Sequence, residues 1–580
     1  MNTSFMKSLF AGIIDQDTIF PYPEISRDDK ENLDLILQAW HEFANDNVDP
    51  VQIDKDEKIP ESVLDGLKEL GFFGLSIPEK YGGGSLSKTM YCRIFEDLCV
   101  TDASIGVSFG AHASIGAIGI IEYGTDKIKE KYLPKMATGE YVAAFALTEP
   151  GAGSDAAGIK TRAVLNEAKS HFILNGSKIW ISNGGISDIW TVFAKTDVVI
   201  DGVTKEKITA FAVEAGWDGC SHGPSEHKLG IRGSNTTTLS FDNVQVPVEN
   251  MLGQLGKGFK VAMEILNSGR LGLAAGNVGG CKELIRLSIE FAKNRKQFGC
   301  AIADFEIIQD KISAMIAEAY AAESMVYLTA GLADRGNVDF SLESAISKVF
   351  ASESLWHAAN ETMQIAGGQG YSREYPYERI LRDSRINLIF EGTNEVLRVF
   401  VALAGMQEPG EYLKKIGKAL RQPIKGLGLL TEFAVSHVKD KVKKDTLKNI
   451  HATLKKEADY FNTYAAELQN YVEKVLMKYG KNIIHQEFIL QRLANMAIQL
   501  YGIAAVLSRV NAMLDKDMNV ERDVPTMQLF CDKAWRTIRR EARQIDTNMD
   551  DTRRSISKTA YDLEKFPFDI FDVAVEKNES

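Results

Sequence analysis

The sequence predicts a mainly α-helical protein with one central β domain, on three observations. Before about residue 140, apolar residues recur at helical spacing over 28–47, 61–70 and 128–136. From about residue 141 to residue 258 the chain changes to short β-rich runs separated by turns, at 171–174, 190–194, 208–213 and 237–246. After the glycines at 256 and 258, long helical periods resume and continue. We therefore expect a helical domain over 1–140 and a β domain over 141–258.

The helical text after the β domain predicts two further domains. Helices expected at 259–296, 305–335, 342–366 and 394–403 would form a four-helix domain over 259–406. An additional helical domain is expected over 407–580. It carries a stripe of apolar residues spaced by four and three, which predicts a core or a subunit interface rather than a cofactor site: Ile489, Leu493, Met496, Leu500, Ile503, Leu507, Val510 and Leu514.

Composition narrows the class of protein. A chain of 580 residues with 45% hydrophobic content can bury several cores, and a net charge of -12 argues against nucleic-acid binding, which needs an excess of positive charge. The six cysteines are scattered without a CxxC pair, which favours a reducing compartment, and no metal site is predicted. No leader peptide and no run of about 18 apolar residues is evident. We expect a cytoplasmic protein of bacterial type.

Glu391 is the strongest candidate for a catalytic group. It follows the apolar run 388–390, which would strip water from the carboxylate and raise its pKa, and it precedes Gly392, which allows a ligand close to the backbone. A second interpretation is that Gly392 and Thr393 only turn the chain and cap the helix 394–403, with Glu391 solvated. The motif alone favours this second interpretation.

Two loops of the β domain could bind a flat, polar ligand. The segment 145–155, FALTEPGAGSD, offers backbone N–H groups and the hydroxyls of Thr148 and Ser154, although many ordinary turns have such a sequence. The segment 178–185, KIWISNGG, places the aromatic ring of Trp180 and the hydroxyl of Ser182 on one face of a strand. A single tryptophan of this kind is more often a core residue.

Two further segments could contact a dinucleotide. Arg295, in NRKQFG after a long helix, could clamp a pyrophosphate, or it could lie at a solvated helix end. Gln364 opens QIAGGQG, a glycine loop without the preceding strand that a Rossmann fingerprint needs. A dinucleotide would therefore bind here without a Rossmann fold.

In order along the chain, LTEPGAGSD, KIWISNGG, NRKQFG, QIAGGQGY and IFEGTNE resemble the motif set of the acyl-CoA dehydrogenase family over residues 1–405. TIFPYPEI, NSGRLG at 267–272 and the added C-terminal part resemble its very-long-chain branch. The resemblance implies a helical domain, a β-barrel-like domain and a four-helix bundle, followed by an extra helical domain. It also implies FAD as cofactor and the conversion of a long-chain fatty acyl-CoA to the trans-2-enoyl-CoA, the first step of fatty-acid β-oxidation.

By this resemblance Glu391 removes the pro-R α-proton while the β-hydride passes to the flavin. The Gly392 N–H and a flavin ribityl hydroxyl would bind the thioester carbonyl. Family members that place the base elsewhere carry a glutamate where this chain has Gly269, beside Arg270. Glu391 therefore has no rival.

The resemblance also implies the binding residues. The residues that would line the flavin and its phosphates are Phe145, Leu147, Thr148, Ser154, Trp180, Ile181 and Ser182. The FAD of a neighbouring subunit would be reached by Arg295, Phe298, Gln364 and Gly368, and the further cofactor contacts would be Gly367, Thr393 and Glu395. The substrate would be bound by Ser154, Asn267, Arg270 and Gly392, with asparagine at 267 in place of a common aspartate. These contacts imply a homodimer or a dimer of dimers.

Chain length, partners and alternatives complete the expectations. The small residues over 106–116 predict a deep pocket, in which each added methylene contributes about 0.8 kcal/mol. The segment 433–456 predicts a basic amphipathic helix, and a solvated face is weighted somewhat above contact with an anionic membrane. The family expectation for the electron acceptor is electron-transfer flavoprotein. A flavin-free scaffold and an acyl-CoA oxidase are the alternative functions.

Overall fold

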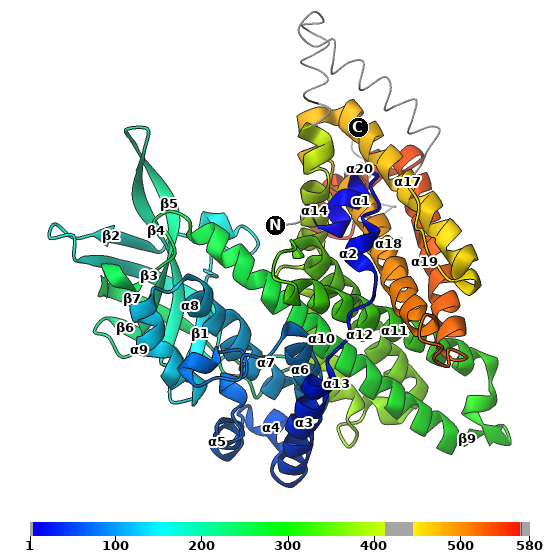
Figure 1. The fold of residues 1–580 in the computed structure, drawn as a ribbon, viewed down its shortest axis with the longest axis horizontal. Helices are drawn as coiled ribbons and strands as arrows, with labels where there is room; N and C mark the ends of the chain where they lie inside the picture. Colours follow the sequence, from blue (N-terminus) through cyan, green and yellow to red (C-terminus); the bar gives the residue numbers. More distant parts are fainter. Residues whose placement is uncertain (1–3, 412–413, 415–444, 569, 571–580) are drawn as a thin grey trace, which may run out of the picture.

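The computed structural model describes residues 4–411, 414, 445–568 and 570 (Figure 1). A helical region, a twisted sheet, a bundle of long helices and a last group of helices follow one another along the chain. In Figure 1 the sheet lies at one side and the last helices, coloured yellow to red, lie at the other. The green helices of the bundle connect the two.

Helices make up the first part of the chain, as predicted. The three predicted helices occur as α3, α5 and α9; α3 begins after Ser26, whose side chain accepts from the Asp29 N–H, and it buries Leu33, Leu37 and Trp40. The helices of this part are α1 (Phe5–Phe10), α2 (Gln16–Ile19), α3 (Arg27–Asn47), α4 (Pro50–Asp56), α5 (Glu61–Glu69), α6 (Lys88–Thr101), α7 (Ala103–Gly110), a π-helical turn (Ala111–Gly116), α8 (Ala117–Tyr123) and α9 (Asp126–Ala137).

One sheet of eight strands forms the central region. Its order is β6-β7-β3-β2-β4-β5-β8, and β1 pairs in parallel with β4. The four predicted strands are present, and all four are longer than predicted. The strands are β1 (Ala143–Ala146), β2 (Arg162–Leu165), β3 (His171–Ser182), β4 (Ile189–Ile200), β5 (Val203–Glu214), β6 (Cys220–His222), β7 (Thr236–Pro247) and β8 (Met251–Leu252).

The bundle contains the four predicted helices and one more. They are α10 (Gly258–Asn294), α11 (Glu306–Asp334), α12 (Ser341–Ala366) and α14 (Asn394–Gly405), and a small hairpin of β9 (Lys296–Gln297) and β10 (Cys300–Ala301) joins α10 to α11. The additional helix is α13 (Tyr377–Arg385). Its sequence YERILRDSR is dominated by charged residues, so the helical spacing of its few apolar residues is not recognisable in the sequence.

The last group of helices packs on the bundle. It contains α17 (Lys455–Tyr479), α18 (Glu487–Leu514), α19 (Asp523–Asp546) and α20 (Asp550–Leu563). The predicted apolar stripe lies on α18 and is buried from Ile489 to Val510, within the core that also includes residues of α11 and α12. The prediction of a core for this stripe is confirmed. The N-terminal helix α1 also packs here, against α17 and α14.

The predicted basic helix over 433–456 lies partly outside the described residues. Where its sequence is described, the chain is non-helical from Asp445 to His451 and forms a single 3-10 turn over Ala452–Leu454 before α17 begins. The prediction is therefore wrong over 445–451. There the Leu447 N–H donates to the Asn462 side chain and the Asp445 side chain accepts from the Ile14 N–H, each at 2.9 Å, so the segment is held by contacts with α17 and with the N-terminal part of the chain.

Two helical stretches are long and apolar enough to cross a membrane by length and composition, namely Ala103–Tyr123 and Glu487–Leu514. In each stretch 83% of the most apolar window is buried inside the protein. Core helices pass the same test, and the burial accounts for the apolar composition of both.

Candidate active site

Glu391 and Gly392 form a tight turn between α13 and α14. Both residues have positive φ, 59° and 94°, a conformation that is costly for glutamate and free for glycine. Two buried cations bind the carbonyl groups of this turn. Arg270 Nε donates to the backbone carbonyl oxygen of Glu391 at 3.1 Å, and Lys348 Nζ donates to the backbone carbonyl oxygen of Gly392 at 2.9 Å. Thr393 then caps α14 by accepting from the Val396 N–H at 3.3 Å.

The carboxylate of Glu391 lies against α10. A Cβ atom built on Gly269 would be 2.9 Å from Oε1 and 3.0 Å from Oε2 of Glu391, and 2.7 Å from Cγ2 of Ile115. The Oε2 atom is buried and has no hydrogen-bond partner. Gly269 therefore leaves the space in which the carboxylate lies.

Burial raises the pKa of Glu391 to about 7, although the nearby charges of Arg270 and Lys348 act in the opposite direction. A carboxyl group with such a pKa exchanges a proton readily near neutral pH. The second interpretation predicted a turn, a helix cap and a solvated Glu391. The turn and the cap are present, but the Oε2 atom of Glu391 is buried.

The source of this burial differs from the prediction. Ile389, one of the three apolar residues expected to exclude water, is 46% exposed. Gly269 lies against the carboxylate instead, and Ile115 borders the same space, since its Cγ2 would be 2.7 Å from a Cβ atom added at Gly269. They come from the π-helical turn and from α10, so the short motif around Glu391 could not reveal them.

Lys348 was not among the predicted site residues. It is fully buried on α12, and besides the Gly392 oxygen its Nζ also donates to Oδ1 of Asn394 at 2.9 Å. Burial lowers its pKa to about 7, while the charge of Glu391 acts to raise it. The sequence contained one signal for this residue: Lys348 is a lone lysine among apolar and small residues at the centre of a helix predicted to be buried.

A second buried lysine supports the loop 148–154. Lys178 is fully buried in β3, and its Nζ donates to the Leu147 oxygen at 3.0 Å and to Glu149 Oε1 at 2.8 Å. Glu149 in turn accepts from the backbone N–H of Thr161 at 2.9 Å. The Ile179 N–H also binds the Thr148 oxygen at 3.0 Å. The base of the loop is thus fixed to the sheet, and neither member of the Lys178–Glu149 pair was predicted.

Trp180 lies at a bulge of β3. The register of β3 against β7 shifts between Lys178 and Ile181, and Trp180 has a φ of 61°. Its side chain is 58% exposed, whereas Lys178 and Ile181 are buried. Trp180 is therefore not the core tryptophan of the alternative interpretation. Ser182 is half-buried on the same strand.

The other predicted residues of the β domain lie around this strand. Phe145 is half-buried at the end of β1, where its ring packs on Phe193, and Leu147 and Ile181 are buried. Thr148 is half-buried, and Ser154 is exposed near the tip of the loop. Added Cβ atoms at Gly151 and Gly153 would meet nothing within 4 Å. An exposed indole beside an open, anchored glycine loop fits a flat ring with a phosphate tail.

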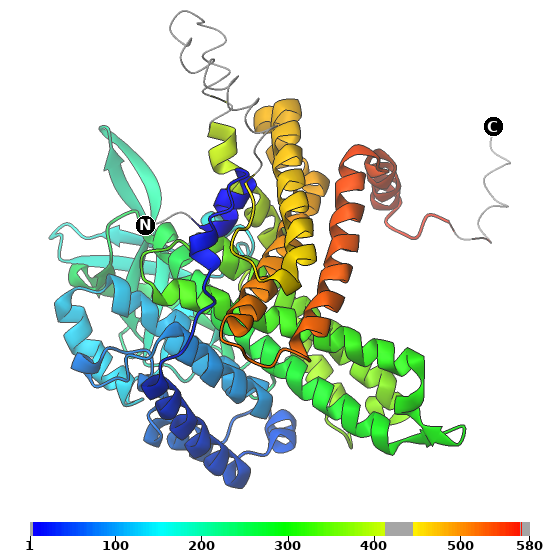
Figure 2. The same ribbon diagram turned by 45° about the vertical axis from the view of Figure 1, so that its right-hand side comes forward.

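The second predicted cofactor set lies elsewhere. Phe298, 95% exposed with a φ of 53°, is at the tip of the hairpin β9–β10, and Arg295 is exposed at the end of α10. Gln364, Gly367 and Gly368 are exposed at the end of α12. Figures 1 and 2 place this hairpin at the end of the bundle remote from the sheet. Within one chain, the two sets are not brought together.

The predicted substrate residues surround the turn or the loop. Arg270 is buried on α10, and its Nη1 donates to Asn267 Oδ1 at 3.2 Å. The Asn267 carbonyl accepts from Ser344 Oγ at 2.6 Å. Glu395, predicted to contact the cofactor, is exposed in the first turn of α14. Among the described residues, no group of three or more His, Cys, Asp or Glu side chains is arranged to hold a metal ion.

Four family sequence models match the chain. They are the acyl-CoA dehydrogenase N-terminal domain over 30–140, the middle domain over 144–244, the C-terminal domain over 256–406, and the ACAD9/ACADV C-terminal domain over 452–565.

Curated relatives and solved structures agree with these models. The very long-chain specific mitochondrial acyl-CoA dehydrogenase of Homo sapiens is 44% identical over 88% of this chain and 79% of its own length, and that of Rattus norvegicus is 42% identical over 96% and 87%. The structure of an acyl-CoA dehydrogenase complexed with FAD from Bacillus anthracis is 32% identical, with a TM-score of 0.78 over 97% of this chain and 96% of that one. This chain is an FAD-binding oxidoreductase that belongs to the acyl-CoA dehydrogenase family.

Proposed function

We propose that this protein dehydrogenates long-chain fatty acyl-CoA between the α and β carbons, with Glu391 as the base. The observation that carries the proposal is the Glu391 carboxylate, which lies against Gly269 with its Oε2 atom buried and unpartnered. An α-proton of a thioester is a weak acid, so the base must be desolvated and the carbonyl must be polarised. Glu391 meets the first condition.

The Gly392 N–H would meet the second. The Glu391 carbonyl and the Gly392 N–H belong to one planar peptide and point in opposite directions. Because Arg270 binds that carbonyl, the N–H is directed away from Arg270 and is free to donate to the thioester oxygen, where negative charge develops as the α-proton leaves. A cation on the carbonyl also polarises the peptide and strengthens the N–H as a donor.

The β domain would hold FAD. Trp180, Ile181 and Ser182 would pack on the ring, and Phe145, Leu147, Thr148 and Ser154 would line the loop that Lys178 supports. When bound, FAD accepts the β-hydride. Thr393 and Glu395 would approach it from the first turn of α14.

A second copy of the chain would complete the cofactor site. Arg295 and Phe298 lie at the β9–β10 hairpin, at the end of the bundle remote from the sheet (Figure 1), and Gln364, Gly367 and Gly368 are close in sequence to Gln369, which lines a surface pocket together with Arg295. They would therefore serve the FAD of a partner and not that of their own chain. We therefore propose a homodimer or a dimer of dimers. Domains over 1–140, 141–258, 259–406 and 407–580 remain our proposed division of the chain.

The preference for long chains rests on the pocket and on the relatives. The segment 106–116, whose small residues predict a deep pocket, lies beside the Glu391 carboxylate, because Ile115 Cγ2 would be 2.7 Å from a Cβ atom added at Gly269. The relatives that are 42–44% identical are named very long-chain specific.

The electron acceptor of the enzyme and the location of the protein in the cell are also proposals. Electron-transfer flavoprotein would take the electrons, in which case oxygen is a poor acceptor and peroxide does not accumulate. We propose a cytoplasmic protein, with peripheral contact to membranes through the last helices as a second possibility. Because the relatives of Homo sapiens and Rattus norvegicus are mitochondrial, fractionation of the source cell is the direct check.

Anaerobic titration with acyl-CoA of 8 to 18 carbons tests the proposal. We expect a yellow protein that is bleached by palmitoyl-CoA and that reacts fastest with long chains. An optimum at eight carbons would refute the long-chain preference. A colourless preparation would support a flavin-free scaffold, and stoichiometric peroxide in air would support an oxidase.

A further inference from the structure

A buried tyrosine lies beside Glu391 along one face of α10. Tyr91 of α6 is 3% exposed, and among the described residues its hydroxyl has no hydrogen-bond partner. A Cβ atom added at Gly272 would lie 3.0 Å from the Tyr91 ring and 3.3 Å from its hydroxyl oxygen, as one added at Gly269 would meet the Glu391 carboxylate. Cβ atoms three residues apart on a helix are about 5–6 Å from each other. The phenol and the carboxylate are therefore neighbours on this face.

The π-helical turn borders both groups with two consecutive residues. Ile115 borders the space of the Glu391 carboxylate, and Ser114 lies close to the Tyr91 hydroxyl. Because Ser114 donates its own proton to the Gly110 carbonyl at 2.8 Å, it offers only lone pairs to Tyr91. The proton of the Tyr91 hydroxyl is thus available for a further acceptor.

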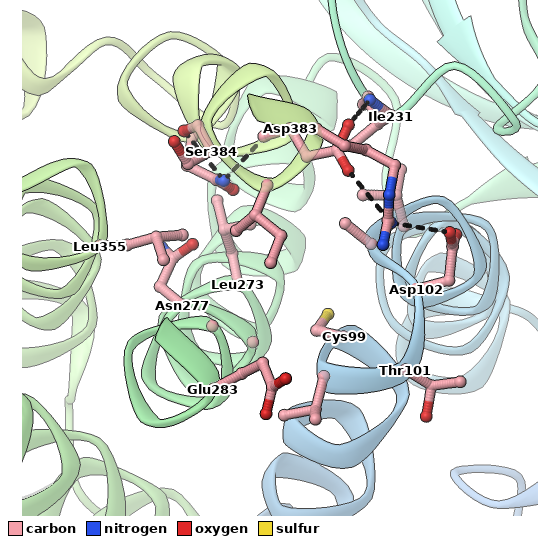
Figure 3. A pocket seen from close by; sticks show the side chains of 18 of the residues that line it. Cys99, Thr101, Asp102, Ile231, Leu273, Asn277, Glu283, Leu355, Asp383 and Ser384 are labelled. Carbon is pink, nitrogen blue, oxygen red and sulfur yellow. Dashed lines mark hydrogen bonds and ion pairs between the residues drawn. The ribbon is translucent and has the colours of Figure 1, made fainter. Parts of the chain in front are cut away.

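A cavity lies further along α10 but does not include these groups. It has a volume of about 200 Å³ and lies between α6, α7, α10, α12 and α13 (Figure 3). Its lining contains Phe95, Cys99 and Gly276, but neither Tyr91 nor Glu391. Tyr91 therefore belongs to the surroundings of the Glu391 turn and not to this cavity.

Tyr91 stays a proton donor throughout the working range of pH. Burial raises its pKa, Ser114 acts in the opposite direction, and the thiols of Cys92 and Cys99 and the carboxylate of Glu391 raise it further. Burial also raises the pKa of both thiols. The phenol is therefore neutral and protonated wherever the carboxylate titrates.

We infer that Tyr91 is a positioning residue for the base, whose hydroxyl donates to one bridging water that in turn donates to Glu391 Oε2. One water joined by two hydrogen bonds of about 2.8 Å spans the separation of the two groups, and the lone pairs of Ser114 give it a third polar partner. The charged groups that face Glu391 are Arg270 of α10 and Lys348 of α12, and the donor from α6 acts with them to lower the pKa that burial raises. The inference rests on the proposed function of Glu391.

The pH dependence of Tyr91→Phe tests it in the holoenzyme. The variant removes one oxygen and keeps the ring, which stacks on Phe109 with centroids 5.7 Å apart. The second-order rate of anaerobic flavin reduction at low palmitoyl-CoA reports the pKa of the base in the free enzyme. Loss of the donor should move the rise of this rate by about one pH unit to higher pH, so that the rate falls about 10-fold at pH 6 and hardly changes at pH 9.

Two further variants separate the hydroxyl from packing. Gly272→Ala keeps the hydroxyl but displaces it, so the rise should move in the same direction by a smaller amount. Tyr501→Phe is the matched control, because it removes a buried hydroxyl that binds Thr329 at 2.8 Å on another helix, and its rate should rise at the pH of wild type. FAD content and thermal unfolding check the folding of each variant.

A Tyr91→Phe rate that is lowered equally at every pH, or that rises at the pH of wild type, would overturn the inference and leave Tyr91 a packing residue. An equal shift in Tyr501→Phe would also contradict it. If Tyr91→Phe does not fold, the rise measured for Gly272→Ala decides by the same criterion. If wild type does not reduce its flavin, or does so at a rate that does not rise with pH, it is the proposed function of Glu391 that fails.

Discussion

Gly269 and the carboxylate of Glu391 occupy adjoining space, since a Cβ atom at position 269 would lie 2.9 Å and 3.0 Å from the two carboxylate oxygens. A contact below 3.0 Å forces a shift, and the same Cβ atom would also lie 2.7 Å from Cγ2 of Ile115. Only one of the positions 269 and 391 can therefore carry a long side chain in this space.

Gly269→Ala should displace the carboxylate and slow flavin reduction by about 10-fold to 100-fold, since a small misplacement of a base has a large effect on rate. FAD content should stay normal. Gly216→Ala is the matched control, because a Cβ there meets nothing within 4 Å and its rate should not change. Equal rates for the two variants would contradict the packing argument.

Lys348→Met should also slow flavin reduction, by about 10-fold or more. The Gly392 carbonyl and Asn394 would lose their shared donor, and Glu391 would lose a nearby cation that opposes the rise of its pKa. Stopped-flow rates of flavin reduction measured over a range of pH separate the two effects. Loss of the cation raises the pKa of Glu391, so the increase of the rate with pH should occur at higher pH than in wild type. Lys348→Arg should restore part of the rate. If the rate of the variant rises at the same pH as that of wild type, Lys348 contributes to folding alone.

An ion network joins the last helices to the bundle. Arg509 of α18 binds Glu323 Oε2 at 2.6 Å, and Lys282 of α10 binds the same carboxylate. Although burial acts to raise it, these cations lower the pKa of Glu323 to about 2. This contribution to stability is full above the unfolded pKa near 4.5 and is lost as pH falls towards 2.

Arg509→Met should therefore lower the free energy of unfolding by about 2 kcal/mol at pH 7, and by much less at pH 3. Urea unfolding at the two pH values measures this. Arg27→Met removes an exposed pair with Glu31 and should change stability by less than about 0.5 kcal/mol. A loss that does not depend on pH would mean that Arg509 contributes packing and not charge.

Phe298→Ser and Arg295→Met should weaken FAD retention without changing the fold of one chain, because both side chains are exposed at the far end of the bundle. Flavin content after gel filtration and the mass of the eluted species by light scattering are the measurements. Full retention of FAD by a monomeric variant would place the whole cofactor site in one subunit.

Most of the architecture could be predicted because its signals are local. The helices over 28–47 and 394–403 have caps and apolar periods in the text itself, and the β3 and β7 strands have β-rich runs. α13 was missed because its charged residues conceal a short apolar face. The segment 445–451 was assigned to a helix from its local sequence, whereas in the folded chain its Leu447 N–H donates to Asn462 and its Asp445 side chain accepts from the Ile14 N–H, contacts that the local sequence does not reveal.

The site was predicted in part for the same reason. Glu391, Gly392 and Trp180 stand in local motifs, whereas Lys348 and Lys178 act through contacts with turns 44 and 31 residues away. The space for the carboxylate also depends on Gly269 of α10, and Ile115 of the π-helical turn borders that space. Such contacts exist only in the folded chain.

The most direct test of the central claim is the rate of anaerobic flavin reduction by palmitoyl-CoA as a function of pH, in wild type and in Glu391→Gln. Because burial raises the pKa of Glu391 to about 7, the wild-type rate should rise as pH increases through about 7 and then level off. Glu391→Gln should bind FAD normally and lose about 10²-fold to 10⁴-fold in rate, without that rising limb. A variant that reduces its flavin at the wild-type rate would place the base elsewhere.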